Sequence, residues 1–256
     1  MISVIVITKN EARNIDACLE SVRWSDDIVV VDAESADDTV ERARRHTSKV
    51  HVRKWEGFSR AKQFAVEQTV HDWVLWLDAD ERVMPELAEE IARLDLRSSA
   101  HSAYRVARRA YFLGRWIRHS GWYPGRVTRL FRKDKARFTD AAVHEGLVIE
   151  GNIADLSHDL LHDTDPNLYH YFEKFNRYTT LAACEADARK KRFGRSDLLI
   201  RPAWLFVKMY VIRRGFLDGM QGLVLALLSS AYVFTKYAKL WELQNKGHNN
   251  EIRNCR

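Results

Sequence analysis

The chain has 256 residues, of which 46% are hydrophobic and 30% are charged, and its formal net charge is +6. This composition favours a globular body with a substantial core, as one large domain or a domain with an appended tail, and leaves no room for a long disordered linker. The excess of cations favours anionic partners such as phosphates, nucleic acid or anionic lipid.

The first residues, 1–8, have no basic start and no cleavage-site pattern, so they predict a strand rather than a signal peptide. The longest apolar run, Leu223 to Phe234, contains two serines and is shorter than the about 20 residues that a spanning helix needs. We therefore expect a cytoplasmic protein that does not cross a membrane.

Short apolar runs alternate with helical patterns over the first hundred residues. The runs predict buried strands, and the intervening apolar periodicity predicts helices, the last of them opened by Pro85. The expected strands are 2–7, 28–31, 50–53 and 73–77, and the expected helices are 10–22, 37–45, 59–68 and 86–94. This alternation implies a parallel sheet with right-handed crossovers.

The pattern changes after residue 100. Residues 103–149 contain alternating polar and apolar runs, which predict antiparallel strands that complete a mixed sheet. From about residue 167 the pattern is helical, aromatic and basic. We predict an α/β protein with a Rossmann-like mixed sheet over residues 1–165 and a helical extension over residues 166–256.

Polar residues follow three of the expected parallel strands, at 8–11, 32–35 and 78–81. Ligands of open α/β sheets bind beyond the carboxyl ends of the strands, so these segments meet at the ligand-binding edge. Each carboxylate taken singly is equally explained as a helix cap or a solvated turn. Together they favour a cation or a donor-rich ligand, because clustered carboxylates repel one another.

The segment Asp78-Ala79-Asp80 is the most informative of the three. Side chains two residues apart leave a strand on the same side, so the two carboxylates are able to converge on one ion. Magnesium and manganese prefer oxygen ligands and often bridge carboxylate to phosphate. The segment therefore predicts a divalent metal site with Asp78 and Asp80 as ligands.

In these motifs the chain resembles the family 2 inverting glycosyltransferases, which have the GT-A fold. The resemblance includes the subgroup of lipopolysaccharide core glucosyltransferases of the WaaE type. It rests on residues 4–11, residues 30–32 with Ser35, Asp37 and Thr39, residues 77–81, residues 122–124 with Arg126, and residues 129–131 and 143–145. The chain departs from the family at Glu34, near which glycine or aspartate is usual.

The resemblance implies transfer of a sugar, with glucose as the first candidate, from a UDP-sugar to a lipid-linked glycan such as the lipopolysaccharide inner core. Residues 1–100 are then the half that binds the nucleotide sugar, and residues 101–165 the acceptor half. The implied roles are Thr8, Asn10 and Glu11 in the nucleotide pocket, Asp32 at the uridine, Asp78 at the ribose or metal, and Asp80 at the metal that bridges the donor diphosphate.

A basic segment, 57–63, follows the third strand and starts a helix. Arg60 and Lys62 at a helix N-terminus suit a diphosphate, although a solvated basic helix face explains them equally well. Inversion also needs a base that takes the proton of the acceptor hydroxyl. Glu145 is the candidate, oriented by His144, with Asp140 in reserve; a surface pair on a loop is the alternative for Glu145 and His144.

Two further groups of residues have a plain structural explanation. The histidines of the segment 158–163 share a spacing that a metal-binding helix would use. Asp165-Pro166 ends any such helix quickly, so we favour a polar segment near the mouth of the active site. Trp122 and Tyr123 offer flat faces for a sugar, or they belong to the core.

The C-terminal third combines cations with aromatic residues, first in the basic run 189–195 and then over 201–217. Such a helix is able to lie in a lipid headgroup interface, with its apolar face inward and its cations on lipid phosphates. The alternative is a core-packing helix with a solvated basic side. No nucleic-acid-binding signature accompanies the charge, so we expect no nucleic acid partner and a protein peripheral to the inner face of the cytoplasmic membrane.

Two other functions fit parts of the pattern. A non-catalytic basic α/β protein that binds a membrane or nucleic acid would explain the charge, but Asp78, Asp80 and Glu145 oppose it. A nucleotidyltransferase would have a glycine-rich phosphate loop after the first strand, and the segment 8–11 contains no glycine.

Overall fold

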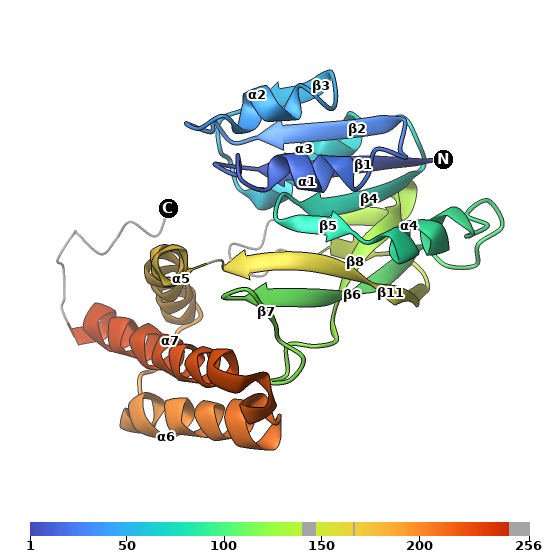
Figure 1. Ribbon diagram of the computed structural model, residues 1–256. Helices are drawn as coiled ribbons and strands as arrows, with labels where there is room; N and C mark the ends of the chain where they lie inside the picture. The colour runs from blue at the N-terminus through green and yellow to red at the C-terminus, as the bar shows by residue number, and fades with distance from the viewer. Residues whose placement is uncertain (140–146, 166, 246–256) are drawn as a thin grey trace. The chain divides into compact units, whose positions relative to one another are not determined.

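The computed structural model describes residues 1–139, 147–165 and 167–245 (Figure 1). They form two compact units. Unit 1 comprises residues 1–109 and 124–163, and unit 2 comprises residues 110–123 together with residues from 164 onward.

The parallel half of the main sheet is built as the apolar runs predicted. Strands β1 (Ile2–Thr8), β2 (Asp27–Asp32), β3 (Lys49–Val52) and β4 (Trp73–Asp78) stand in the order β3-β2-β1-β4 and pair in parallel. Every residue of β1 and β2 is buried. Central strands covered on both faces need such unbroken apolar sequences.

Helices α1 (Ile15–Glu20), α2 (Thr39–Ala43) and α3 (Phe58–Glu67) connect these strands. Alternate residues of β1 point to opposite faces: Val4 and Val6 pack with Ile15 and Leu19 of α1, whereas Ile5 packs with Ala65 of α3. This arrangement gives the helix–sheet–helix layers of an open α/β domain (Figure 1).

The remaining strands complete a mixed sheet, as predicted, and within residues 103–149 the printed pairings of the main sheet are antiparallel. After β5 (Glu81–Val83) and α4 (Pro85–Ala92) come β6 (Ala103–Phe112), β7 (Arg115–Trp116), β8 (Gly125–Arg132) and β11 (Ile153–Asp165). The sheet continues from β4 in the order β8-β6-β11-β5, and β7 pairs with the end of β6. A 3-10 turn, Lys133–Lys135, precedes a separate small sheet of β9 (Ala136–Phe138) and β10 (Leu147–Ile149).

One local prediction was wrong, and one alternative that we did not favour is excluded. The helix expected over 10–22 begins only at Ile15, because Asn10 has a left-handed φ of 54° and its backbone N–H donates to Ser35 Oγ. The segment 158–163, considered as a helix, lies in the long strand β11. In both places contacts with another part of the sheet replace the local helical hydrogen bonds.

Unit 2 is mainly helical. Helix α5 (Leu168–Ala188) is capped by the Asn167 side chain, and α6 (Arg195–Phe206) continues into a π-helix, Val207–Ile212. A 3-10 turn, Gly215–Asp218, leads into α7 (Gly219–Asn245). Buried Asp218 fixes this turn, since its carboxylate accepts from the backbone N–H groups of Arg118 and His119.

The apolar run Leu223 to Phe234 is part of a longer helical stretch than expected. Residues 215–245 form 31 helical residues with a mean hydropathy of 1.4 in the most apolar window, of which 22% is buried. By length and composition this stretch is long enough to cross a membrane, which the apolar run alone is not, and the expectation that the chain does not cross one stays a prediction. The helix is also part of a core, because Leu225 and Ala226 pack with Phe112 and Met209, and core helices pass the same test.

Candidate active site at the end of strand β4

The predicted polar segments meet at one edge of the sheet. Thr8 is paired with Asp32 across β1 and β2, and Asp78 is paired with Ile7 across β4 and β1. The carboxyl ends of the parallel strands therefore place Thr8, Asp32 and Asp78 side by side, as the strand order requires.

Asp78 shares a cation with Glu81. The Arg129 guanidinium, on β8, donates from Nη2 to Asp78 Oδ2 and to Glu81 Oε1, each at 2.6 Å. The backbone N–H of Asp78 also donates to Glu81 Oε2 at 3.1 Å. Glu81 and Arg129 are buried, and Arg129 lies 4.0 Å above the ring of Trp76. Two carboxylates are thus held by one enclosed guanidinium.

The electrostatics of this group follow from its burial. Burial raises the pKa of Glu81, and Asp78 adds to the rise while Arg129 opposes it. Burial also acts to raise the pKa of Asp78, but the charges of Arg129 and Lys62 outweigh it, so the pKa of Asp78 lies below its usual value. Asp78 is therefore a carboxylate at neutral pH, available to a donor group or a cation.

Asp80 faces a histidine that was not predicted as a site residue. His162 Nε2 lies 3.4 Å from Asp80 Oδ2, and the backbone N–H of Asp163 donates to the Asp80 carbonyl at 3.0 Å. His162 reaches this place because β11 pairs antiparallel with β5, opposite Glu81. An ion pair between Arg82 and Asp163 also connects β5 with β11.

Within the described ranges, no three His, Cys, Asp or Glu side chains converge in a way that would hold a metal. Asp80 and His162 offer one carboxylate oxygen and one imidazole nitrogen, which are both donors that divalent metals accept in proteins. Asp78 is already bound to Arg129. A divalent ion at this edge would therefore take its remaining ligands from water and phosphate oxygens, as such ions commonly do at phosphate-binding sites.

The loops after β1 and β2 are locked together. Asn10 Oδ1 accepts from the backbone N–H of Ala36, and the backbone N–H of Glu11 donates to Thr39 Oγ1. The Asp32 carboxylate is fully buried and accepts from both the backbone and the hydroxyl of Ser35. Asn10, Glu11 and Asp32 thus belong to one hydrogen-bonded group of loops at the carboxyl ends of β1 and β2, which we call the rim.

Two residues of this rim show local features of interest. Thr8 Oγ1 is buried and has no hydrogen-bond partner among the residues that the structure describes, and such a group normally finds one. Glu34 has a left-handed φ of 55°, a conformation that glycine adopts at no steric cost.

Arg60 and Lys62 lie on α3 but serve different places. Arg60 lines a narrow cavity of about 30 Å³ together with Asp32 and Arg53. Lys62 is buried, with its ammonium 3.9 Å above the ring of Trp76, and it lowers the pKa of Asp78. Lys62 therefore belongs to the Asp78 group, and Arg60 belongs to the small cavity beside Asp32.

Other predicted residues lie elsewhere. Glu145, His144 and Asp140 lie outside the described residues. Trp122 and Tyr123 are in unit 2, where Trp122 packs edge-on against Phe112 and Tyr123 against Trp116. His158, the other histidine of the 158–163 segment, contacts Glu90.

Residues 3–184 match the family described as Glycosyl transferase family 2. The chain belongs to this family. An uncharacterised glycosyltransferase of Rickettsia typhi is 32% identical over 265 residues, which cover 97% of this chain and 89% of that protein. The lipopolysaccharide core biosynthesis glycosyltransferase LpsC of Rhizobium meliloti is 30% identical over 248 residues, which cover 94% of this chain and 92% of that protein.

Among solved structures, glucosyl-3-phosphoglycerate synthase from Mycobacterium tuberculosis, in complex with Mn²⁺, UDP-glucose and phosphoglyceric acid, is 22% identical. The similarity covers 43% of this chain and 44% of that chain, with a TM-score of 0.37. The family assignment confirms the predicted glycosyltransferase activity and the GT-A type of fold, and it selects an enzyme over the non-catalytic alternative.

Proposed function

We propose that this family 2 glycosyltransferase transfers glucose from UDP-glucose to a lipid-linked glycan, such as the lipopolysaccharide inner core, with a divalent metal at Asp80. Two findings support the proposal. A lipopolysaccharide core glycosyltransferase is similar over nearly the whole chain. The observation that carries it is the approach of His162 to Asp80 beside the Asp78–Arg129 pair.

The residues of unit 1 have separate tasks in this proposal. Asp80 and His162 would hold the metal, which when bound would neutralise the charge that grows on the departing diphosphate. Asp78, oriented by Arg129 and kept ionised, accepts a hydrogen bond from the donor ribose. Thr8 Oγ1, without a partner among the described residues, faces the same edge and supplies a polar contact for the nucleotide.

The residues proposed for the acceptor side come from the sequence analysis. Inversion needs a base on the face of the sugar opposite the leaving diphosphate. Glu145 keeps this role in the proposal, with His144 to orient it. Removal of the acceptor proton raises the nucleophilicity of the hydroxyl oxygen as it attacks the anomeric carbon.

The matched pair of histidines on β11 gives a direct test of the metal assignment. We expect the Asp80→Asn and His162→Gln variants to lose Mn²⁺-assisted binding of UDP by about 10–100-fold, measured by calorimetry, because each loses one metal ligand. The His158→Gln variant is the control, since His158 contacts Glu90 instead. If wild-type protein binds UDP equally well with and without Mn²⁺ or Mg²⁺, the proposed metal site is wrong.

We also propose that unit 2 attaches the enzyme to the inner face of the cytoplasmic membrane. One face of α6 and the π-helix carries Ile200, Trp204, Val207 and Val211, spaced four, three and four residues apart. All four are exposed, Ile200 by 66% and Trp204 by 58%. A helix of a soluble protein would turn such a stripe towards its core.

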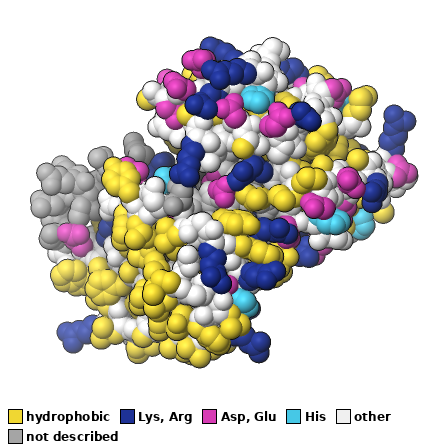
Figure 2. All heavy atoms as spheres, viewed as in Figure 1, with side chains coloured by type: hydrophobic (Ala, Val, Ile, Leu, Met, Phe, Trp, Pro, Cys, Tyr) yellow, Lys and Arg dark blue, Asp and Glu magenta, His cyan; other side chains and the backbone are white. Residues whose placement is uncertain are grey.

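Helix α7 carries a second stripe. Met220, Leu227, Phe234 and Trp241 are seven residues apart and all exposed, so they run along one side of the helix for about 30 Å. Figure 2 shows hydrophobic side chains gathered over these helices, with Lys and Arg side chains beside them. Apolar stripes with neighbouring cations fit an anionic lipid surface.

A further inference from the structure

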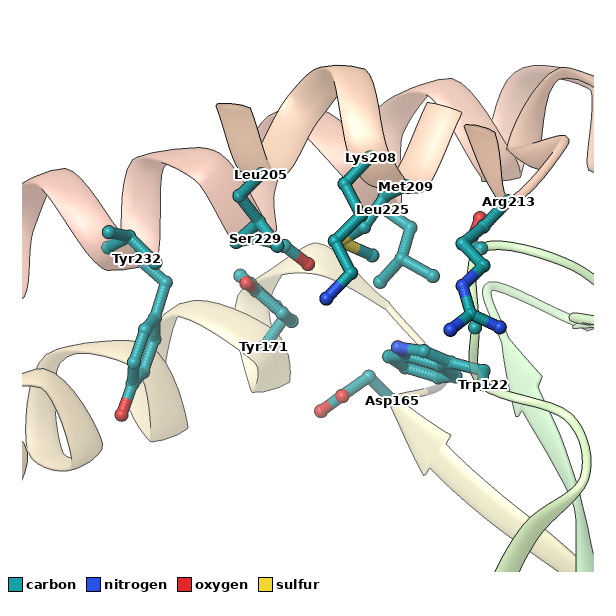
Figure 3. Close-up of a pocket in the computed structure, with 13 residues that line it drawn as sticks. Trp122, Asp165, Tyr171, Leu205, Lys208, Met209, Arg213, Leu225, Ser229 and Tyr232 are labelled. Atoms are coloured by element: carbon teal, nitrogen blue, oxygen red, sulfur yellow. The ribbon is translucent and has the colours of Figure 1, made fainter. Parts of the chain in front are cut away.

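Unit 2 contains a cavity of about 450 Å³ that has no part in the proposed chemistry of unit 1. Thirteen residues from five segments line it (Figure 3). They come from the loop after β7, the end of β11, and helices α5, α6 with its π-helix, and α7, and they include Trp122, Asp165, Tyr171, Lys208, Arg213 and Leu225.

Two cations face this cavity. Lys208 comes from the π-helix and Arg213 from the residue that ends it. Neither side chain pairs with a carboxylate in the part of the chain that the structure describes, whereas Arg201, on the same helical segment, pairs with Asp197. Figure 3 shows the Lys208 ammonium directed into the space above Trp122, with the Arg213 guanidinium beside that ring.

The single carboxylate of the lining is partly neutralised. Asp165 Oδ1 contacts His170 Nδ1 at 3.2 Å and lies 3.8 Å from Lys174 Nζ. Its other oxygen forms no bond to a described residue and is able to accept a hydroxyl. The net electrostatic character of the cavity is therefore positive, with one hydrogen-bond acceptor at its base.

Polar donors stand near these charges. Ser120 is 4% exposed, and its hydroxyl has no hydrogen-bond partner among the described residues. Burial, with the nearby Asp165 and Tyr232, raises the pKa of Tyr171 to about 12. Tyr171 therefore keeps its proton at neutral pH and is able to donate it in a hydrogen bond.

The remaining wall is apolar. Leu205, Met209, Leu225 and Val233 line it, and Trp122 adds a flat aromatic face. The π-helix contributes both to this wall and to the cations; such interruptions of an α-helix are found mostly at functional sites. The same segment carries the exposed Val207 and Val211, so the cavity belongs to a unit with an apolar surface.

We propose that this cavity binds one phosphate-bearing lipid, with its phosphate on Lys208 and Arg213 and the start of its apolar chain against Leu205 and Leu225. A free anion would not need the apolar wall, and a neutral lipid would offer the two cations of the lining no anionic partner. Asp165 and Trp122 add contacts that a sugar headgroup would use. The role of this lipid as the sugar acceptor rests on the proposed function; its binding does not.

The test uses the full chain and a soluble short-chain lipid, dihexanoyl phosphatidic acid below its micelle concentration. We expect the Lys208→Gln, Arg213→Gln double variant to bind this lipid at least about tenfold more weakly than wild type by calorimetry, because both phosphate contacts are lost. The control is Arg177→Gln with Lys190→Gln, which removes the same charge from exposed positions outside the cavity. The Ser229→Phe variant, which fills the cavity, should also weaken binding.

Three results would overturn the proposal: no binding of the phosphatidic acid, equal binding of inorganic phosphate alone, or equal binding of dihexanoyl glycerol, which lacks the phosphate. Equal loss in the control double variant would also overturn it, since attraction would then depend on net charge alone. Mn²⁺-assisted UDP binding is measured on the same samples. If the wild-type protein binds the phosphatidic acid but shows no Mn²⁺-assisted binding of UDP, the proposed function is rejected. If it shows Mn²⁺-assisted binding of UDP but does not bind the lipid, only this inference is rejected.

Discussion

The two units place their polar and apolar residues in opposite ways. In unit 1, strands β1 and β2 are wholly buried, and the enclosed group also contains Arg129 and Glu81. In unit 2, Ile200 and Trp204 are mostly exposed, and the buried Asp218 accepts from two backbone N–H groups and contacts the imidazole of His119. Unit 1 thus encloses charge, whereas unit 2 exposes apolar surface.

This contrast separates two physical tasks. Charges enclosed among aromatic rings interact strongly, because water does not screen them, and they hold a fixed geometry for a polyanionic donor. Exposed apolar stripes beside cations gain free energy only when another apolar phase covers them. Our proposals accordingly place donor chemistry in unit 1 and membrane attachment in unit 2, and four changes test them.

The largest effect is expected at the acceptor side. The Glu145→Gln variant should lose about 10²–10⁴-fold in transfer rate while it still binds UDP, because only the proton acceptor is removed. The rate is measured as UDP release from UDP-glucose with extracted lipid acceptor. The neighbouring Glu150→Gln variant is the control, and near wild-type transfer by Glu145→Gln would show that another group is the base.

Removal of the buried Arg129 guanidinium should destabilise the fold of unit 1. The Arg129→Met variant leaves Asp78 and Glu81 close together without their shared partner, so the free energy of unfolding should fall by about 3–5 kcal/mol, measured by urea denaturation. Arg132→Met, on the same strand, removes the exposed pair with Asp134 and should cost less than about 1 kcal/mol. Equal losses would mean that Arg129 is no more important to the fold than a surface arginine.

Substitutions on the exposed apolar stripe of unit 2 should weaken membrane binding and leave the free energy of unfolding unchanged. The Ile200→Asp, Trp204→Asp double variant should bind anionic liposomes about 100-fold more weakly in flotation, since two large apolar side chains no longer enter the lipid. The control makes the same changes in unit 1, at exposed Ile153 and Trp24. If the wild-type protein does not float with the liposomes but associates with itself, the apolar stripes bind a second copy of the chain instead of lipid.

The smallest effect concerns a carboxylate within unit 1. Burial acts to raise the pKa of Asp27, but Lys49 and Ser3, with the backbone N–H of Val70, lower it overall. The ionised group therefore stabilises the fold above its unfolded pKa, and this contribution is lost as pH falls through the lower folded value.

The Asp27→Asn variant should lower the free energy of unfolding at pH 7 by about 1–3 kcal/mol and flatten its decline in acid. Denaturation between pH 7 and pH 3 measures both. Asp72→Asn, an exposed position in the same unit, is the control. An unchanged acid profile for Asp27→Asn would show that this carboxylate does not stabilise the fold through its charge.

Much of unit 1 was predictable from the sequence because its signals are local. Unbroken apolar runs identified β1, β2 and β4, and the residues directly after them identified Thr8, Asp32 and Asp78. The helix expected at residue 10 failed because Asn10 has a left-handed conformation, in which its backbone N–H donates to the hydroxyl of a distant residue, Ser35.

The partners of these residues depended on the tertiary structure. The acidic and histidine residues of the segment 158–163 were the signal available for His162, but only the register of β11 against β5 places it at Asp80. Arg129 is one of 41 cations in the chain, and only the position of β8 beside β4 directs it to Asp78.

By itself the sequence determined the parallel sheet, its polar edge and the helical, basic character of the C-terminal third, because strand period, strand ends and composition are properties of neighbouring residues. Tertiary structure alone decided which cation meets Asp78, which histidine meets Asp80, and that Trp122 joins Lys208 around a cavity. Each of these depends on segments distant in the chain, and the order and register in which such segments pack leave no local pattern.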